Sequence, residues 1–316
     1  MKKILVIGGA GLIGRNLIKK LNQYDYKIYI YDFCKSYLDK KIDEKFFKKK
    51  LKGLNYSKFI NGDIRDKKIL KSIIYNFDPS IIVHLGNLPL ADYSNDHPKE
   101  TISNILLGTI NVLEILRNYP KKIRLIYASS SMVYGDFKYS PCDENHPKSP
   151  KDVYGATKLA TETMISTYQK RYGIEYTIIR PSSVYGPNDM NKRVVQIFIE
   201  NAIKNKPLIL HNRGASLLDF TYVEDIATGL YLSIKKFDKS KNEIFNITAG
   251  KSRSLKDLVN ILQKHFSDLK IQYSTKKLIR PKRGTLDISK AKKLLQYKPK
   301  YNLEKGIKKY LSHYKI

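Results

Sequence analysis

The chain has 316 residues, 42% of them hydrophobic and 28% charged, which is the composition of an ordinary globular protein with a substantial core. Lys and Arg number 59 against 29 Asp and Glu, and the net charge of +30 suggests a nucleic-acid partner. Most of these basic residues are lysines spread along the chain, with none of the clustering of a basic arm. We therefore expect a solubilising charge that also attracts anionic ligands, and no nucleic-acid or other polyanion-binding role.

No segment approaches the roughly 18 consecutive apolar residues that a membrane span needs. Near the N-terminus, the apolar run covers only residues 4–7 before the glycines begin, too short for a signal-peptide core of about 7–15 residues. The two cysteines, Cys34 and Cys142, match no zinc or redox spacing. These features predict a cytoplasmic protein with free thiols, no membrane partner and no metal.

In chain order, short β-branched runs alternate with helical stretches through the first half of the sequence. Strands are predicted at residues 3–7, 27–31, 58–61, 80–85, 124–129 and 175–180, and helices at residues 11–23, 67–76, 98–118 and 152–172. This alternation is typical of βαβ units, and it predicts an α/β fold with a Rossmann-type, doubly wound parallel sheet.

After Pro181 the pattern loosens. Gly, Pro and Asn gather in residues 182–191, which marks a loop. A helix is predicted at residues 194–204, followed by shorter mixed elements. We expect a first domain at residues 1–181 and a smaller C-terminal lobe at residues 182–316, parts of which return to the first domain.

Three glycines follow the first strand at three-residue spacing: Gly8, Gly11 and Gly14. They let the backbone turn tightly and approach a pyrophosphate, which the N-terminus of the following helix can bind. Asp32 ends the second strand, about 20 residues further on, where a carboxylate accepts hydrogen bonds from ribose hydroxyls. That carboxylate would repel a 2′-phosphate, so the pattern favours NAD over NADP.

Tyr154 and Lys158 are four residues apart on the predicted helix and so share one face. A free tyrosine, with a pKa of about 10, is a poor base at neutral pH. A cation about 4 Å away, at an effective dielectric of about 20, would contribute roughly 4 kcal/mol, or about three pKa units. Tyr154 is therefore a candidate base for removing a hydroxyl proton. Ser129, Ser130 and Ser131 follow the fifth strand, at the sheet edge where ligands bind.

Taken together, these motifs resemble the extended short-chain dehydrogenase/reductase family, and within it the NAD-dependent sugar-nucleotide epimerases and dehydratases. The resemblance spans the chain through GGAGLIG, HLG, SSSMVYG, YGATK, RPSSVYGP, DFTYVEDIA and a late DISKA. It implies that Ser130 hydrogen-bonds the reacting oxygen and that Tyr154 is the base. Lys158 would tune Tyr154 and hold the nicotinamide ribose.

The resemblance also implies the remaining site residues. The expected NAD-binding residues are Gly8, Gly11, Leu12, Ile13, Gly14, Asp32, Phe33, Asp63, Ile64, Leu85, Tyr154, Lys158 and Pro181. The expected substrate-binding residues are Ser130, Ser131, Ser183, Arg193, Arg280 and Arg283. The arginines are candidates for the substrate diphosphate, because a guanidinium matches paired oxygens.

Four positions depart from the family pattern. Ile7 replaces a Thr before the glycines, and Ser183 replaces a common Asn. Leu218 stands where many relatives have an Arg, so one phosphate contact is absent or has moved, with Arg213 a candidate. Relatives that eliminate water have an Asp-Glu pair where this chain has Ser131-Met132, which argues against a 4,6-dehydratase.

The sequence thus predicts NAD-dependent oxidation at C4 of a nucleotide-linked sugar, in surface polysaccharide or sugar-nucleotide biosynthesis. A 4-epimerase and a 4-dehydrogenase both remain open, as do the nucleotide and the sugar. The alternatives are a 4,6-dehydratase, a 4-keto reductase and, in another class, a non-enzymatic NAD-binding sensor. The helices at residues 98–118 and 152–172 are expected to pair in a homodimer. Histidines are expected to have no metal role, with His84 simply packed beside the cofactor.

Overall fold

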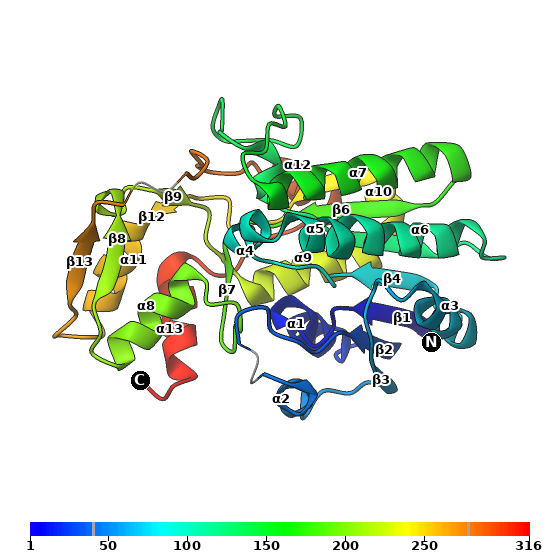
Figure 1. Cartoon of the computed structure of the whole chain (residues 1–316), viewed down its shortest axis with the longest axis horizontal. Coiled ribbons are helices and arrows are strands. Elements are labelled where there is room, and N and C mark those ends of the chain that lie inside the picture. Colours follow the sequence, from blue (N-terminus) through cyan, green and yellow to red (C-terminus); the bar gives the residue numbers. More distant parts are fainter. Residues whose placement is uncertain (40–41, 277–278) are drawn as a thin grey trace.

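A seven-stranded parallel sheet forms the centre of the computed structural model, which describes residues 1–39, 42–276 and 279–316 (Figure 1). The strand order is β11-β6-β5-β4-β1-β2-β3. The strands are β1 (Lys2–Ile7), β2 (Tyr26–Asp32), β3 (Lys58–Asn61), β4 (Ile81–His84), β5 (Arg124–Ala128), β6 (Tyr176–Arg180) and β11 (Glu243–Asn246). This is the Rossmann-type order with one added strand, and it confirms the predicted fold class.

Helices cover both faces of the sheet and bury its branched aliphatic residues. On one face lie α1 (Leu12–Leu21), α2 (Glu44–Leu51), α9 (Val223–Lys235), α10 (Phe237–Ser240) and α12 (Ser289–Leu295). On the other lie α3 (Lys67–Phe77), α6 (Gly108–Arg117) and α7 (Val153–Tyr172). Because both faces are covered, β4 is buried at every residue, as its continuous apolar run requires.

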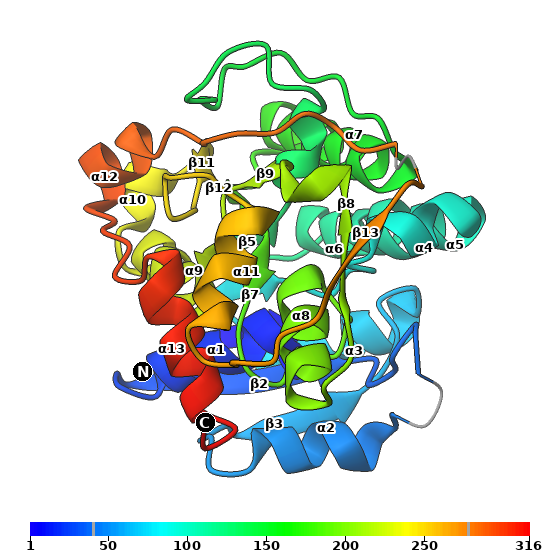
Figure 2. The same ribbon diagram turned by 90° about the vertical axis from the view of Figure 1, so that its left-hand side faces the viewer.

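The C-terminal lobe has a hydrophobic core of its own and lies beyond the carboxyl ends of the strands (Figures 1 and 2). Its helices are α8 (Val194–Ile203), α11 (Leu255–Gln263) and α13 (Leu303–Ser312). Short strands pair as β7 (Val184–Tyr185) with β10 (Thr221–Tyr222), β9 (Leu217–Leu218) with β12 (Arg253–Ser254), and β8 (Leu208–His211) with β13 (Ile271–Ser274). β11 and α12 come from late sequence but pack on the central sheet.

The predicted helix at residues 98–118 is confirmed as a continuous helical segment that contains a π-helical turn. It consists of α5 (Pro98–Ile102), a π-helical turn (Ser103–Leu107) and α6, and is preceded by a separate short helix, α4 (Ala91–Asp96). Pro98 sets the start of α5, since proline lacks the amide that would continue α4. Sequence reasoning missed α4 and α2, because each is short and α2 buries only Phe47 and Leu51.

Capping residues define both ends of α7, the helix that carries Tyr154 and Lys158. The Asp152 side chain caps its N-terminus by accepting a hydrogen bond from the Gly155 amide at 2.7 Å. Gly173, at φ 72°, ends it in the left-handed conformation. None of the described helices is both long enough and apolar enough to span a bilayer.

Candidate functional site

A cavity of about 1380 Å³ lies at the carboxyl ends of the strands, between the sheet and the C-terminal lobe. It is lined by every predicted cofactor-binding residue: Gly8, Gly11, Leu12, Ile13, Gly14, Asp32, Phe33, Asp63, Ile64, Leu85, Tyr154, Lys158 and Pro181. It is also lined by every predicted substrate-binding residue: Ser130, Ser131, Ser183, Arg193, Arg280 and Arg283. One space therefore brings together residues from opposite ends of the chain.

The glycine turn between β1 and α1 leaves no room for a side chain at Gly8 or Gly14. Gly8 has φ 78°, and a Cβ there would lie 2.5 Å from the Gly86 nitrogen. A Cβ on Gly14 would lie 2.4 Å from the Gly8 carbonyl oxygen. Gly11 precedes α1 with no side-chain cap, so the first amides of the helix are free to bind an anion. This geometry fits the pyrophosphate of a dinucleotide.

Asp32 lies at the end of β2 beside this turn. Its Oδ2 accepts a hydrogen bond from the Ala10 amide and its Oδ1 one from the Cys34 amide, both at 2.9 Å. Burial raises the pKa of Asp32, whereas these amides and Arg15 lower it. The carboxylate is thus held in place while further lone pairs remain for ribose hydroxyls, which fits NAD.

Substituting Asp32→Asn should shift cofactor preference towards NADP. The amide keeps an oxygen acceptor but removes the negative charge that repels a 2′-phosphate. We expect the ratio of the Kd for NADP to the Kd for NAD to fall about tenfold or more, as measured by isothermal titration calorimetry. An unchanged ratio would show that Asp32 does not face the adenosine ribose.

Asp63, one of the expected NAD-binding residues, forms hydrogen bonds with a neighbouring arginine. Arg65 Nε donates to both carboxylate oxygens of Asp63 at 2.9 Å. Burial acts to raise the pKa of Asp63, but the hydrogen bonds and charge of Arg65 lower it overall. The Arg65 guanidinium also lies 5.8 Å from the centre of the Phe33 ring. Arg65 thus joins two of the predicted cofactor-binding residues.

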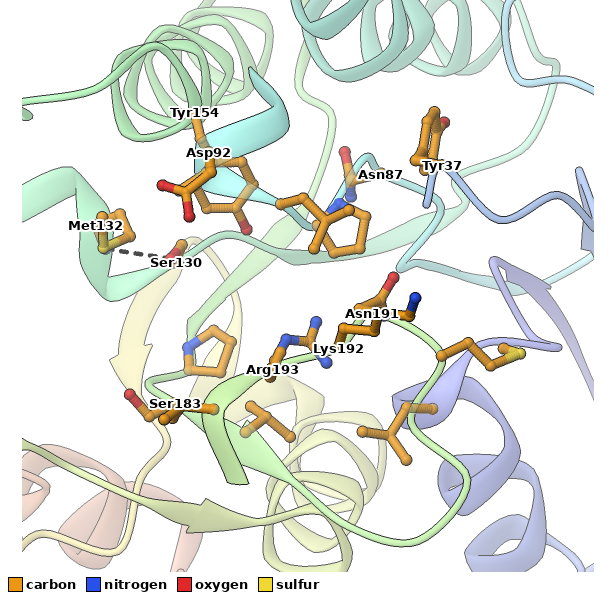
Figure 3. A pocket seen from close by; sticks show the side chains of 18 of the residues that line it. Tyr37, Asn87, Asp92, Ser130, Met132, Tyr154, Ser183, Asn191, Lys192 and Arg193 are labelled. Carbon is orange, nitrogen blue, oxygen red and sulfur yellow. Dashed lines mark hydrogen bonds between the residues drawn. The ribbon is translucent and has the colours of Figure 1, made fainter. Parts of the chain in front are cut away.

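Tyr154 and Ser130 meet at the reactive end of the cavity (Figure 3). The Met132 amide donates to Ser130 Oγ at 3.2 Å, which leaves the serine proton available to donate. Lys158 reaches the cavity wall from one turn further along α7 and is 2% exposed. Its Nζ donates to the Ala128 carbonyl at 2.7 Å and to the Tyr127 hydroxyl at 3.3 Å. One ammonium proton remains for a ligand.

The electrostatics differ from the sequence expectation. Lys158 Nζ lies 5.8 Å from the centre of the Tyr154 ring, because the Ala128 carbonyl holds it. Burial raises the pKa of Tyr154, while the hydrogen bond from Ser130 and the charge of Arg193 lower it. In the protein by itself, Lys158 is therefore not the group that lowers the pKa of Tyr154, contrary to the sequence expectation. Burial instead lowers the pKa of Lys158 to about 7, although Glu162 acts to raise it.

This lowered pKa predicts a pH-dependent stability. Between pH 7 and the ordinary lysine pKa of 10.5, unfolded chains hold a proton on Lys158 that folded chains lack. Stability therefore rises with pH in this window, by up to about 1.4 kcal/mol per pH unit from this group. We expect the free energy of unfolding of the wild type, minus that of Lys158→Met, to rise between pH 7 and 9 in urea titrations. A flat difference would contradict the lowered pKa.

The predicted substrate arginines have different partners. Arg193 donates to Asp189 Oδ2 at 2.8 Å, and Arg280 donates to Asp92 Oδ2 at 2.6 Å. Arg283 contacts Met132 Sδ at 3.6 Å. Leu218 does line the cavity, but Arg213, the proposed replacement for the missing phosphate contact, does not.

Sequence reasoning missed several residues of this cavity. Figure 3 shows Tyr37, Asn87, Asp92, Asn191 and Lys192 along its walls. They follow β2, β4 and β6, so the rule that ligands bind at the carboxyl ends of strands is the signal that could have found them.

Two of the histidines, His84 and His146, are packed residues. His84 is fully buried, with Nε2 3.0 Å from Thr109 Oγ1, and burial lowers its pKa to about 3. His146 is also buried; its Nε2 accepts from the Lys138 amide at 2.7 Å. Among the described residues, no group of His, Cys, Asp or Glu is arranged to hold a metal ion.

Comparison with known proteins identifies the family of the chain. The model of the NAD dependent epimerase/dehydratase family matches residues 4–248. A putative UDP-glucose 4-epimerase of Methanocaldococcus jannaschii is 35% identical over 315 residues, which cover 97% of this chain and 96% of the relative.

Two solved structures share the fold over nearly their whole length. The UDP-glucose 4-epimerase of Thermotoga maritima, solved with UDP-glucose, superposes with a TM-score of 0.89 at 27% identity and covers 99% of this chain and 98% of that chain. The UDP-glucuronic acid 4-epimerase of Bacillus cereus, solved with UDP-glucuronic acid and NAD, gives 0.90 at 28% identity and 99% coverage of both chains.

Proposed function

The chain belongs to the NAD dependent epimerase/dehydratase family, and from this premise we propose that it is a sugar-nucleotide 4-epimerase. One observation carries the proposal. The dinucleotide cradle of Gly8, Gly14 and Asp32 opens into the same cavity as Ser130 and Tyr154. The cavity has a volume of about 1380 Å³, and both solved relatives above are 4-epimerases of UDP-linked sugars.

In this proposal, Tyr154 reacts as the phenolate, which the hydrogen bond from Ser130 and the charge of Arg193 favour, and its oxygen takes the proton of the C4 hydroxyl. Ser130 donates its free proton to the same sugar oxygen and holds it in place. Lys158 is anchored to Ala128 and directs its remaining proton towards the ribose next to the reacting ring. Bound NAD supplies the hydride acceptor. Once the sugar has rotated to present its other face, return of the hydride to C4 and of the proton from Tyr154 to the C4 oxygen would give the epimer.

Two alternatives share these residues. A 4-dehydrogenase would release the keto sugar with net NADH, and a 4-keto reductase would run the same chemistry in reverse. A 4,6-dehydratase has less support, since Ser131 and Met132 line the cavity where an acid and a base would be needed. A non-enzymatic sensor would not require Ser130, Tyr154 and Lys158 to lie together at one end of the cavity.

The direct test is incubation with UDP-, GDP- and dTDP-linked sugars, with nicotinamide absorbance and NMR of the products as readouts. A new C4 epimer without net NADH supports the proposal, and accumulating NADH assigns a dehydrogenase. If no sugar nucleotide in the panel is changed, the proposed function is wrong.

The predicted division also stands as part of this proposal, with residues 1–181 binding NAD and residues 182–316 mainly binding the sugar nucleotide. We further propose a cytoplasmic protein of sugar-nucleotide or surface-polysaccharide biosynthesis. Fractionation of the source cells tests the location, because recovery in the membrane or secreted fraction would exclude it.

A homodimer through α5, the π-helical turn and α7 is the proposed assembly. Ile102 on α5 and Leu107 on the π-helical turn are 42% and 50% exposed. Along α7 the small residues Ala156, Ala160 and Thr163 are exposed at helical spacing, which permits close approach of a second helix. Light scattering that gave a monomer mass of 36.6 kDa at micromolar concentration would exclude this dimer.

A further inference from the structure

The charge arrangement at the reactive end of the cavity bears on which sugars fit there. Asp92, the second residue of α4, points its carboxylate into the pocket that holds Ser130, Met132 and Tyr154 (Figure 3). A chain of contacts fixes this position. Asp92 pairs with Arg280, and Arg283, three residues further on, contacts Met132, whose amide donates to Ser130. Asp92 therefore lies at the end of the cavity where the sugar reacts.

One carboxylate oxygen of Asp92 can still accept a hydrogen bond from a ligand. Its Oδ2 is taken by Arg280, but Oδ1 has no hydrogen-bond partner among the residues that the structure describes, and the side chain is 70% exposed. An ionised carboxylate accepts hydrogen bonds and donates none. Oδ1 thus suits a hydroxyl of the substrate and opposes a second carboxylate.

The nearby cations do not reverse this preference. Arg280 is already paired with Asp92 at 2.6 Å. Arg283 rests on the Met132 thioether and lies close enough to Asp152 to feel its charge. The two guanidinium groups are thus matched by two carboxylates, Asp92 and Asp152. No net positive charge remains in this group to stabilise an anionic sugar, and Arg193, whose charge also reaches Tyr154, is paired with Asp189 at 2.8 Å.

We propose that Asp92 is a specificity-determining residue that selects nucleotide-linked hexoses with a neutral hydroxymethyl group at C5 over the corresponding uronates. C5 is bonded to the reacting C4, so its substituent lies next to the oxygen held by Ser130 and Tyr154. The hydroxymethyl donates to Asp92 Oδ1, whereas a uronate carboxylate is repelled by it. This inference rests on the proposed function, and it separates the two substrate classes seen among the relatives.

The test compares UDP-glucose with UDP-glucuronate, which differ only at C6, on the NAD-loaded full-length protein. Binding is measured by calorimetry and turnover as kcat/KM for the C4 epimer. For the wild type we expect UDP-glucose to bind about tenfold more tightly or better, because like charges at close range are costly. Asp92→Asn should bring the Kd ratio close to one.

Two further variants make the result specific. Asp96→Asn removes an exposed carboxylate from the same helix, outside the cavity, and should leave the ratio unchanged. Arg280→Gln breaks the ion pair but keeps the carboxylate, so discrimination should persist or increase. Equal or tighter binding of UDP-glucuronate by the wild type overturns the inference, as does a ratio insensitive to Asp92→Asn or failure to bind either sugar. Binding is measured independently of turnover. A protein that discriminates between the two sugar nucleotides but forms no epimer would therefore contradict only the proposed function.

Discussion

Tyr154→Phe should lower turnover of the sugar nucleotide by about 10²–10⁴-fold, the range for loss of a positioned acid or base. The substitution removes one oxygen atom from the reactive end of the cavity and leaves the ring that packs there. Binding of NAD and of the sugar nucleotide should change little. We expect the loss in kcat and not in either Kd, as measured by single-turnover kinetics and calorimetry.

Tyr75→Phe is a suitable control for this experiment. Tyr75 is 41% exposed on α3, and its hydroxyl donates only to the Asn118 carbonyl at 3.2 Å. Its removal should leave turnover within about twofold, as expected of a surface change. If Tyr154→Phe kept more than a tenth of the wild-type rate, Tyr154 would not be the base, and the sensor or another catalytic arrangement would gain support.

The second large effect is expected from Glu162→Ala, which should lower the free energy of unfolding by about 3–5 kcal/mol. Glu162 lies on α7 and pairs with Arg180 at the end of β6. Arg180 Nε donates to Glu162 Oε1 at 3.0 Å, and Arg180 Nη2 donates to Glu162 Oε2 at 2.6 Å. The side chain of Glu162 is 4% exposed and that of Arg180 is 1% exposed. Truncating the glutamate leaves a buried guanidinium without its counter-charge.

The surface pair Glu44–Lys48 provides the comparison. Its side chains are 36% and 56% exposed, so Glu44→Ala should cost less than about 1 kcal/mol. The double variant Glu162→Leu with Arg180→Met should be less destabilised than Glu162→Ala, since no buried charge remains unpaired. Urea titrations measure all three. A cost for Glu162→Ala as small as that for Glu44→Ala would mean that water or another group compensates Arg180.

This ion pair also connects stability to the site. Glu162 is one turn beyond Lys158 on α7, and its charge acts to raise the pKa of that lysine. Arg180 Nη1 donates to the Tyr134 hydroxyl at 2.8 Å, on the turn that follows Ser130. The pair therefore ties α7 to the strand ends that present Ser130. Sequence reasoning identified neither residue, because they are 18 positions apart and only the packing of α7 on the sheet brings them together.

Much of the fold followed from local patterns. The continuous apolar runs predicted six of the seven central strands, and glycine spacing with Asp32 predicted the dinucleotide site beside β1. These signals are readable because they depend on one strand, one turn or one helix face. The helix predicted at residues 98–118 is also present, from Pro98 to Arg117, and only its π-helical turn left no signal in the apolar pattern.

The amino-acid sequence by itself determined the parallel sheet, the glycine cradle and the shared face of Tyr154 and Lys158, since each depends on residues close together in the chain. Tertiary structure alone decided that Lys158 is held by Ala128, that burial sets the pKa values of both catalytic candidates, and that Asp92 meets Arg280 across 188 positions of sequence. Desolvation and ion pairing depend on how distant segments pack, and no local pattern records them.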